Sequence, residues 1–251
     1  MNIQDSTVLV TGANRGIGKA FADALLDRGA TKVYAAVRDV TTVTDPRVVP
    51  VQLDVTDPDR VAVVARELDD VQLVVNNAGV LNVNLPLRAS IDTARAELET
   101  NYLSLVSMTQ AFAPVLERNG GGAFVNVLSA FSWVAIPLVT TYSASKAAGW
   151  SYTNAARIEL KLQGTHVVAV HAGPVDTDMA AGFDMEKIPA ATVAESALDA
   201  LEAGEPEALA DDYSRGVKAA LSDDQRTLYP QVEREFLEIV GATPTATGGD
   251  E

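Results

Sequence analysis

The fold is decided by one stretch near the N-terminus, Thr7-Val8-Leu9-Val10-Thr11-Gly12-Ala13-Asn14-Arg15-Gly16-Ile17-Gly18. Its apolar start, residues 7–10, is typical of a buried strand. A helical pattern of apolar residues follows from Ile17 and stops at Gly29. Glycines between a strand and a helix let the backbone approach a pyrophosphate, whose charge the helix N-terminus favours. Three glycines alone are a weak signal, but the strand and helix around them indicate a nucleotide site.

Strands and helices alternate along the rest of the chain. Further strands are predicted from apolar runs at residues 32–37, 48–53, 71–75, 123–128 and 166–170. The alternation predicts an α/β fold, a doubly wound parallel sheet of Rossmann type with helices on both faces. We expect one domain over residues 1–241 and a flexible acidic tail over residues 242–251. Ligands bind such sheets at the carboxyl ends of the strands, where the glycine turn, Asp54 and residues 76–79 fall.

Composition narrows the class of protein. Hydrophobic residues make up 47% of the chain, so a packed core is expected rather than disorder. The formal net charge of −15 argues against a nucleic-acid partner, because phosphates would be repelled. The absence of cysteine excludes disulfides and thiol catalysis, and with two histidines no metal site is expected. No apolar run is long enough for a membrane span and no secretory signal is seen, so we expect a cytoplasmic protein.

The second predicted strand bears on the choice of dinucleotide. An NAD site would place an acidic residue about 20 residues past the glycine turn, to bind the ribose 2′-hydroxyl. Val37 stands there instead, followed by Arg38, which with Arg15 would form a fork for a 2′-phosphate. Asp39 next door weakens this interpretation, and the alternative is two solvated arginines. We expect NADP(H) to be preferred over NAD(H).

A second group of residues points to proton chemistry on an oxygen. Tyr142 and Lys146 are four positions apart, so on a helix their side chains share one face. A nearby ammonium favours the phenolate and lowers the pKa of a tyrosine from its ordinary value of ~10. Ser129 closes a predicted strand, where its hydroxyl can hold a carbonyl oxygen beside the phenol. Each residue alone is more often a packing, solvated or turn residue, but together they indicate an enzyme.

The substrate is expected at the mouth beside these residues. Phe131 and Trp133 alternate along an extended stretch and suggest an apolar pocket, although they could equally be core or interface aromatics. Met179 lies in a short substrate loop that we expect at about residues 178–190. Asn101 falls within a helical pattern. It is either an exposed polar residue or, in a helix kink, a group that holds a water.

Taken in order, these pieces resemble the short-chain dehydrogenase/reductase family, in its single-domain branch, over nearly the full chain. The matching motifs are the glycine turn at residues 11–18, Asp54, the Asn-Asn-Ala-Gly run at residues 76–79, Asn101, Ser129, Tyr142 and Lys146. The resemblance implies that Tyr142 is the general acid in carbonyl reduction and the base in alcohol oxidation. It also implies that Lys146 lowers the pKa of Tyr142 and binds the nicotinamide ribose. Ser129 would hold the substrate oxygen, and Asn101 would anchor a water joined to Lys146.

The resemblance also implies which residues contact the cofactor. They are Gly12, Asn14, Arg15, Gly16, Ile17, Gly18, Arg38, Asp54, Val55, Asn77, Ala78, Gly79, Tyr142, Lys146, Gly173, Val175 and Thr177. Asp54 and Val55 would flank the adenine, and Val175 and Thr177 the carboxamide. The loop after residue 171 departs from the Pro-Gly usual in the family, because it reads Ala172-Gly173-Pro174. We still expect it to reach the cofactor.

The expected function is an NADPH-dependent carbonyl reductase or alcohol dehydrogenase that acts on a small ketone, aldehyde or secondary alcohol. The expected substrate contacts are Ser129, Phe131, Trp133, Tyr142 and Met179. One rival is a non-catalytic protein that senses NADP(H), and another is a sugar-nucleotide epimerase. The C-terminal part lacks the glycine-rich strand ending common in tetrameric members. We therefore expect a homodimer through two long helices, roughly residues 100–117 and 143–162, with a homotetramer as the alternative.

Overall fold

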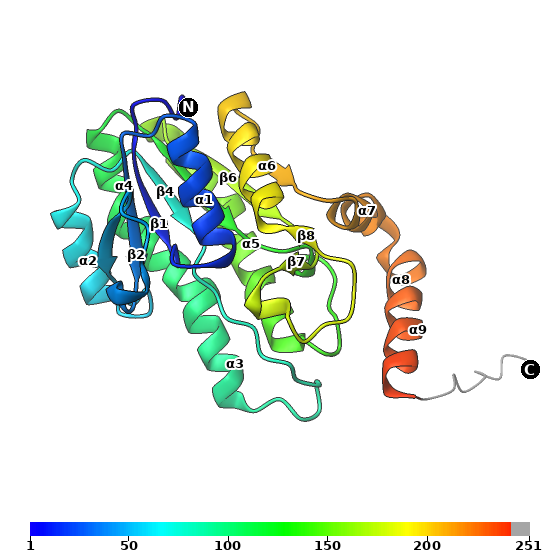
Figure 1. Ribbon diagram of the computed structural model, residues 1–251. Coiled ribbons are helices and arrows are strands. Elements are labelled where there is room, and N and C mark those ends of the chain that lie inside the picture. Colours follow the sequence, from blue (N-terminus) through cyan, green and yellow to red (C-terminus); the bar gives the residue numbers. More distant parts are fainter. Residues whose placement is uncertain (242–251) are drawn as a thin grey trace, which may run out of the picture.

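A parallel sheet of seven strands lies at the centre of the molecule, in the order β3-β2-β1-β4-β5-β6-β9 (Figure 1). The strands are β1 (Thr7–Thr11), β2 (Lys32–Val37), β3 (Val49–Gln52), β4 (Leu73–Asn76), β5 (Ala123–Val127), β6 (His166–His171) and β9 (Glu207–Leu209). Each neighbouring pair is parallel. The computed structural model describes residues 1–241, and the predicted acidic tail, residues 242–251, lies outside them.

Helices cover both faces of the sheet. One face carries α1 (Gly16–Asp27) and α6 (Ala190–Ala203), which pack against each other. The other face carries α2 (Pro58–Glu67), α4 (Ser104–Arg118) and α5 (Thr140–Leu160). The two groups lie on opposite sides of the strands in Figure 1. This arrangement confirms the predicted doubly wound α/β fold of Rossmann type.

The two cores explain why residues 8–10 of β1 are all apolar. Val8 and Val10 belong to the core that includes Phe21 of α1. Leu9, between them, belongs to the opposite core, with Phe112 of α4. Successive side chains of a strand point to opposite faces, so a strand covered on both sides buries every residue.

Between β4 and β5 the chain forms three helical pieces in succession. They are α3 (Ile91–Leu98), a π-helical turn (Glu99–Leu103) and α4. The sequence predicts two helices here, and the structure joins them through the π turn. Such turns widen the helix and occur often at functional sites, and this one contains Asn101.

The chain after β6 completes the sheet and then leaves it. A short ladder of β7 (Val175–Asp176) and β8 (Ile188–Pro189) brackets the predicted substrate loop.

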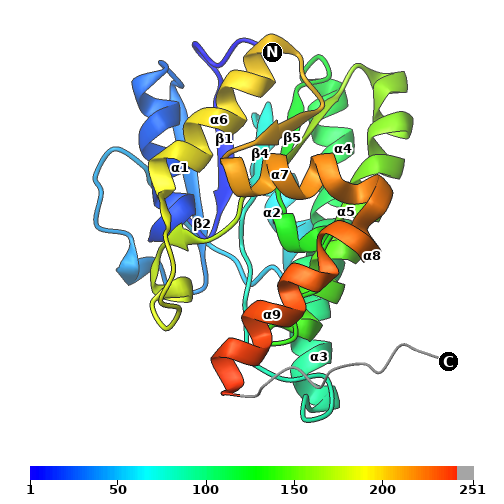
Figure 2. The same cartoon turned by 90° about the vertical axis from the view of Figure 1, so that its right-hand side faces the viewer.

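Three helices, α7 (Asp212–Ala220), α8 (Asp224–Thr227) and α9 (Tyr229–Val240), then follow one another along one side (Figure 2). α8 and α9 are separated at Leu228. No helix of residues 1–241 is long and apolar enough to span a bilayer. The predicted boundary at residue 241 stays a prediction.

The order of the strands reverses between β1 and β4. β1 pairs with β2 on one side and with β4 on the other, so the chain winds away from this boundary in both directions. Open α/β sheets bind ligands in the crevice at such a switch point, outside the carboxyl ends of the strands. Here the two strands end at Thr11 and Asn76.

Candidate active site

The turn after β1 is hydrogen-bonded to the segment that follows β4. Thr11 Oγ1 accepts from the backbone N–H groups of Asn77 at 2.9 Å and Ala78 at 3.0 Å. Asn77 Nδ2 donates to the Thr11 carbonyl oxygen at 2.8 Å. These bonds bring the glycine turn and residues 77–79 side by side at the switch point.

Two positions of the turn require glycine. Gly18 has no room for a side chain, and Gly12 has a backbone conformation that other residues rarely adopt. A Cβ on Gly18 would lie 2.2 Å from the Gly12 carbonyl oxygen and 2.5 Å from Asn77 Nδ2. Gly12 has a φ of 68°, in the left-handed region. Since α1 begins at Gly16, the first N–H groups of the helix open beside the turn. Close backbone and helix polarity together fit a pyrophosphate.

A cleft of about 1020 Å³ opens over the carboxyl ends of the strands. Its lining includes these predicted site residues: Gly12, Asn14, Arg15, Gly16, Ile17, Arg38, Asp54, Val55, Asn77, Ala78, Gly79, Tyr142, Lys146, Thr177 and Met179. Small-molecule sites commonly span about 300–1,000 Å³, so the cleft has the size for a dinucleotide and a small substrate. Gly18 and Val175 are buried close by.

The loop after β6 lies beside the glycine turn, and its expected contact with the cofactor stays a prediction. A Cβ on Gly16 would lie 3.2 Å from Thr177 Cγ2, which shows how closely the two segments approach. The course of the loop is fixed from the C-terminal side, because the Gly173 N–H donates to the Asp211 carboxylate at 2.8 Å. Asp211 also caps α7 by accepting from Ser214 N at 2.7 Å.

The two predicted arginines of the cleft have different surroundings. Arg15 pairs with Asp178 at 2.6 Å, and both side chains are exposed. The structure thus differs from the predicted fork of Arg15 with Arg38, because Asp178 of the substrate loop competes for the Arg15 guanidinium. Within residues 1–241, Arg38 makes no ion pair closer than 4 Å. Hydrogen bonds from Thr56 chiefly lower the pKa of Asp54, and Arg38 contributes to that lowering.

Tyr142 and Lys146 lie one turn apart on α5, both buried. Lys146 Nζ is 5.7 Å from the centre of the Tyr142 ring and donates to the Val127 carbonyl oxygen at 2.9 Å. Burial raises the pKa of Tyr142 to about 12, and the interaction with the Ser129 side chain works in the opposite direction. Burial likewise lowers the pKa of Lys146 to about 8. The pKa of Tyr142 is therefore shifted upward, opposite to the lowering expected beside the ammonium, because desolvation is the largest cause of the shift.

Asn101 is buried in the π turn and holds the loop after β4. Its Oδ1 accepts from Val80 N at 2.9 Å, and its Nδ2 donates to the Val80 carbonyl oxygen at 2.9 Å. Nδ2 also donates to Ser145 Oγ at 2.9 Å. Asn101 and Lys146 both line a cavity of about 10 Å³, roughly the room of one water. The water between them stays a prediction.

Ser129 follows β5 and begins a 3₁₀ turn at Ala130–Ser132. Its Oγ accepts from Phe131 N at 3.1 Å and donates to the Ala172 carbonyl oxygen at 3.4 Å. Phe131 and Trp133 after it do not line the cleft formed by residues 1–241, and their place in the substrate wall stays a prediction. Trp133 stacks on His171 with ring centres 3.8 Å apart, and Phe131 packs edge-on against Tyr213. Both serve the packing of the C-terminal part, the alternative that the sequence left open.

The model of the short chain dehydrogenase family matches residues 6–187. This chain belongs to that family. It is similar to the 3-oxoacyl-(acyl-carrier-protein) reductase of Synechocystis, with 31% identity over 72% of this chain and 78% of that protein. Among solved structures it is similar to a short chain dehydrogenase from Burkholderia cenocepacia in complex with NADP, with 39% identity, a TM-score of 0.88 and coverage of 92% and 99%. NADPH-bound carbonyl reductase from chicken fatty liver is 26% identical, with a TM-score of 0.72 and coverage of 79% and 91%. The short-chain dehydrogenase fold and the oxidoreductase class are thus established.

Sequence reasoning missed one buried acid of this short-chain dehydrogenase. Glu97 lies one helical turn before Asn101 and is fully buried. Its Oε1 accepts from Asn82 N at 2.7 Å, while Oε2 has no hydrogen-bond partner in the described part of the chain. The carboxylate adds to the rise in the Tyr142 pKa. A glutamate among polar helix residues gives no sign of burial, so the sequence carried no usable signal.

Replacing Gly18 by alanine should abolish tight dinucleotide binding. The added Cβ would overlap the Gly12 carbonyl oxygen, so the turn must shift from the geometry that accepts a pyrophosphate. We expect the Kd for NADPH to rise at least about tenfold, measured by fluorescence titration. The control is Gly216→Ala in α7, where a Cβ meets no described atom within 4 Å. Equal affinities for the two variants would contradict this assignment of the turn.

Replacing Lys146 by methionine should stabilise the fold at pH 7. Burial lowers the pKa of Lys146 from 10.5 to about 8, so folding at pH 7 carries the cost of a buried charge. That cost is about 3 kcal/mol. The variant also leaves the Val127 carbonyl without its donor, which offsets about 1 kcal/mol or more of the gain in the free energy of unfolding. Urea unfolding should show a variant more stable by about 1–2 kcal/mol.

The effect of pH on this difference has a definite sign. Above pH 8 folded Lys146 has released its proton, whereas the unfolded chain keeps it up to pH 10.5. The free energy of unfolding of the wild-type protein therefore rises with pH between these two pKa values. The stability advantage of Lys146→Met must shrink accordingly. Lys161→Met, at an exposed position after α5, is the control. An advantage that stays constant from pH 7 to pH 10 would show that the buried charge is not its origin.

Proposed function

We propose that this short-chain dehydrogenase is an NADPH-dependent carbonyl reductase or alcohol dehydrogenase. Its substrate would be a ketone or aldehyde, or a secondary alcohol in the reverse direction. The observation that carries the proposal is that buried Tyr142 and Lys146 line the same cleft as the glycine turn. A dinucleotide seated on that turn then reaches a phenol that can exchange a proton with a carbonyl oxygen.

Several features support NADP(H) as the dinucleotide. The glycine turn fits the pyrophosphate, and Asp54 with Val55 and Asn77 with Gly79 lie where adenine and its ribose would follow. Arg38 lines the cleft with its guanidinium free of ion pairs in residues 1–241, so it can bind a 2′-phosphate. Two similar structures have NADP or NADPH bound. Arg15, paired with Asp178, contributes less.

The residues of the chain would act on the oxygen of the substrate. In the reducing direction the carbonyl carbon gains the hydride that the nicotinamide supplies. The carbonyl oxygen gains the proton of Tyr142, which is a neutral phenol at pH 7 because its pKa is about 12. Ser129 would donate a hydrogen bond to the same oxygen and stabilise the developing negative charge. In oxidation the phenolate takes the proton, so that direction is favoured by rising pH.

Lys146 would orient rather than react. Its ammonium is present below pH 8, and its bond to Val127 fixes its Nζ beside the tyrosine ring. A water in the cavity that Lys146 shares with Asn101 would return a proton towards Tyr142. Substrate selection would fall to the loop at residues 178–190, where Met179 is 45% exposed beside the cleft.

The proposed assembly is a homodimer through α4 and α5. α5 carries Ile158 at 76% exposure, and Leu103, in the π turn just before α4, is 42% exposed. Burial of such residues between two copies would remove apolar surface from water. The predicted cytoplasmic location stays a prediction.

Tyr142→Phe tests the proposed chemistry. The change removes one hydroxyl and keeps the buried ring, so the fold and the affinity for NADPH should be retained. Without the proton donor, kcat for carbonyl reduction should fall by about 10²- to 10⁴-fold, measured from NADPH absorbance over a panel of ketones and aldehydes. Tyr152→Phe, ten residues further along α5, should keep wild-type turnover. Wild-type turnover in Tyr142→Phe would end the proposal.

Arg38→Ala tests the choice of cofactor. Loss of a charge-assisted contact to the 2′-phosphate should lower kcat/KM for NADPH by about 10- to 100-fold. The value for NADH should change little, because NADH has no phosphate there. Arg66→Ala, at the exposed end of α2, is the matched control. The assignment fails if both cofactors lose equally, or if the wild-type enzyme prefers NADH.

A further inference from the structure

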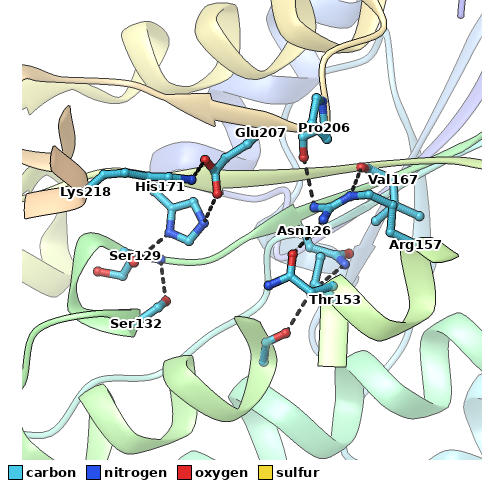
Figure 3. Close-up of polar contacts among 12 residues, drawn as sticks. Asn126, Ser129, Ser132, Thr153, Arg157, Val167, His171, Pro206, Glu207 and Lys218 are labelled. Carbon is cyan, nitrogen blue, oxygen red and sulfur yellow. Dashed lines mark hydrogen bonds and ion pairs between the residues drawn. The ribbon is translucent and has the colours of Figure 1, made fainter. Parts of the chain in front are cut away.

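A fully buried histidine lies directly behind the candidate active site. His171 is the last residue of β6 and has no exposed surface. Its ring lies flat against Trp133, with an interplanar angle of 19°. The proposed chemistry makes no use of it, and Figure 3 shows it between Ser129 on one side and Glu207 on the other.

The hydrogen bond of His171 to Ser129 fixes the form of the ring. Nδ1 lies 2.9 Å from the Ser129 carbonyl oxygen. A carbonyl oxygen can only accept, so Nδ1 carries the hydrogen. Nε2 faces Glu207 Oε1 at 3.6 Å, beyond hydrogen-bond distance. Burial lowers the pKa of His171 to about 3, so the ring is neutral at pH 7 and Nε2 carries none.

Charged groups from three elements surround this ring. Glu207 of β9 forms an ion pair with Lys218 of α7, so its negative charge is balanced without a protonated His171 (Figure 3). Lys218 Nζ also lies 5.1 Å from the centre of the Trp133 ring, on which His171 stacks. Arg157 and Lys146 of α5 further disfavour protonation. The imidazole is thus held as a fixed, neutral donor.

The His171 ring binds the backbone of Ser129, and the backbone conformation sets the direction of the Ser129 side chain. Ser129 is extended, with φ −163° and ψ 157°, and its N–H donates to Ser132 Oγ at 3.3 Å. His171 donates to the Ser129 carbonyl. The Ser129 hydroxyl donates to the carbonyl of Ala172, the residue that follows His171. With both sides of the peptide fixed, the Cα–Cβ bond of Ser129 has one direction. Active-site groups need such support to stay within about 0.5 Å of their working positions.

We propose that His171 is a positioning residue: its Nδ1–H group fixes the Ser129 carbonyl and so sets the direction of the Cα–Cβ bond that carries the Ser129 hydroxyl. The inference rests on the proposed function, in which Ser129 binds the substrate oxygen. Trp133 acts through the ring, by keeping its orientation.

Two amide replacements of His171 separate the donor from the bulk of the ring. Asparagine can place an N–H group near the position of Nδ1–H, whereas glutamine extends its amide towards the position of Nε2. We expect His171→Asn to keep most of the wild-type kcat and His171→Gln to lose about 10- to 100-fold. The Kd for NADPH should stay at the wild-type value in both, because the ring binds Ser129, stacks on Trp133 and faces Glu207, none of them a proposed cofactor residue. The inference is overturned if the two variants have equal kcat.

The same replacements in a Ser129→Ala background test whether the effect passes through Ser129. With the hydroxyl already removed, His171→Gln should cause no further loss of kcat. A general disturbance of the fold would instead lower kcat by the same factor in both backgrounds. His166→Gln is the matched control, because His166 begins the same strand and binds the Glu205 carbonyl at the edge. It should leave kcat unchanged.

Two further results keep the test decisive. If His171→Gln does not fold by circular dichroism, His171→Leu takes its place, since it lacks a donor and fills the apolar space beside Trp133. Leucine should then show the same loss, restricted to the background that has Ser129. A wild-type protein that consumes no NADPH with any carbonyl compound contradicts the proposed function itself. Wild-type turnover with an undiminished His171→Gln or His171→Leu contradicts only the role of His171.

Discussion

The site depends on the junction of two strand ends, where Thr11 binds the segment after β4. The threonine hydroxyl accepts two N–H groups from residues 77 and 78 and donates to the Val75 carbonyl oxygen at 3.2 Å. It therefore closes the gap that opens where the strand order reverses. Gly12 and Gly18 can approach Asn77 only because this junction is tight. The cleft, the helix N-terminus beside it and the floor of the site all follow from this one junction.

Burial sets the protonation states of Tyr142 and Lys146. Removing Tyr142 and Lys146 from water favours the neutral form of each, so the pKa of the phenol rises and that of the amine falls. At pH 7 the phenol still holds its proton and the amine is still an ammonium. Both are then in the form that carbonyl reduction needs. Burying the ammonium lowers stability, as is common at functional sites.

Local patterns predicted most of the fold and the centre of the site. The apolar run of β1, the glycines of its turn and the i, i+4 spacing of Tyr142 and Lys146 are properties of neighbouring residues. What these patterns did not predict concerns pairs far apart in the chain. Arg15 meets Asp178, 163 residues away, and Trp133 meets His171 through a stack that no periodicity encodes. The sign of the Tyr142 pKa shift was also missed, because depth of burial depends on the packing of α3, α5 and the loops together.

Side chains of the C-terminal part after residue 187, outside the match to the family, reach backbone groups and His171 beside the site. Asp211 holds the amide of Gly173 with the carboxylate that also caps α7, and so ties the loop after β6 to that helix. Glu207 and Lys218 flank His171, which in turn binds the carbonyl of Ser129. Neither contact involves an atom that would touch a substrate. Substitutions in β9 and α7 can thus alter the positions of the Ser129 and Gly173 loops, and with them the geometry of the site, without a change in the site residues.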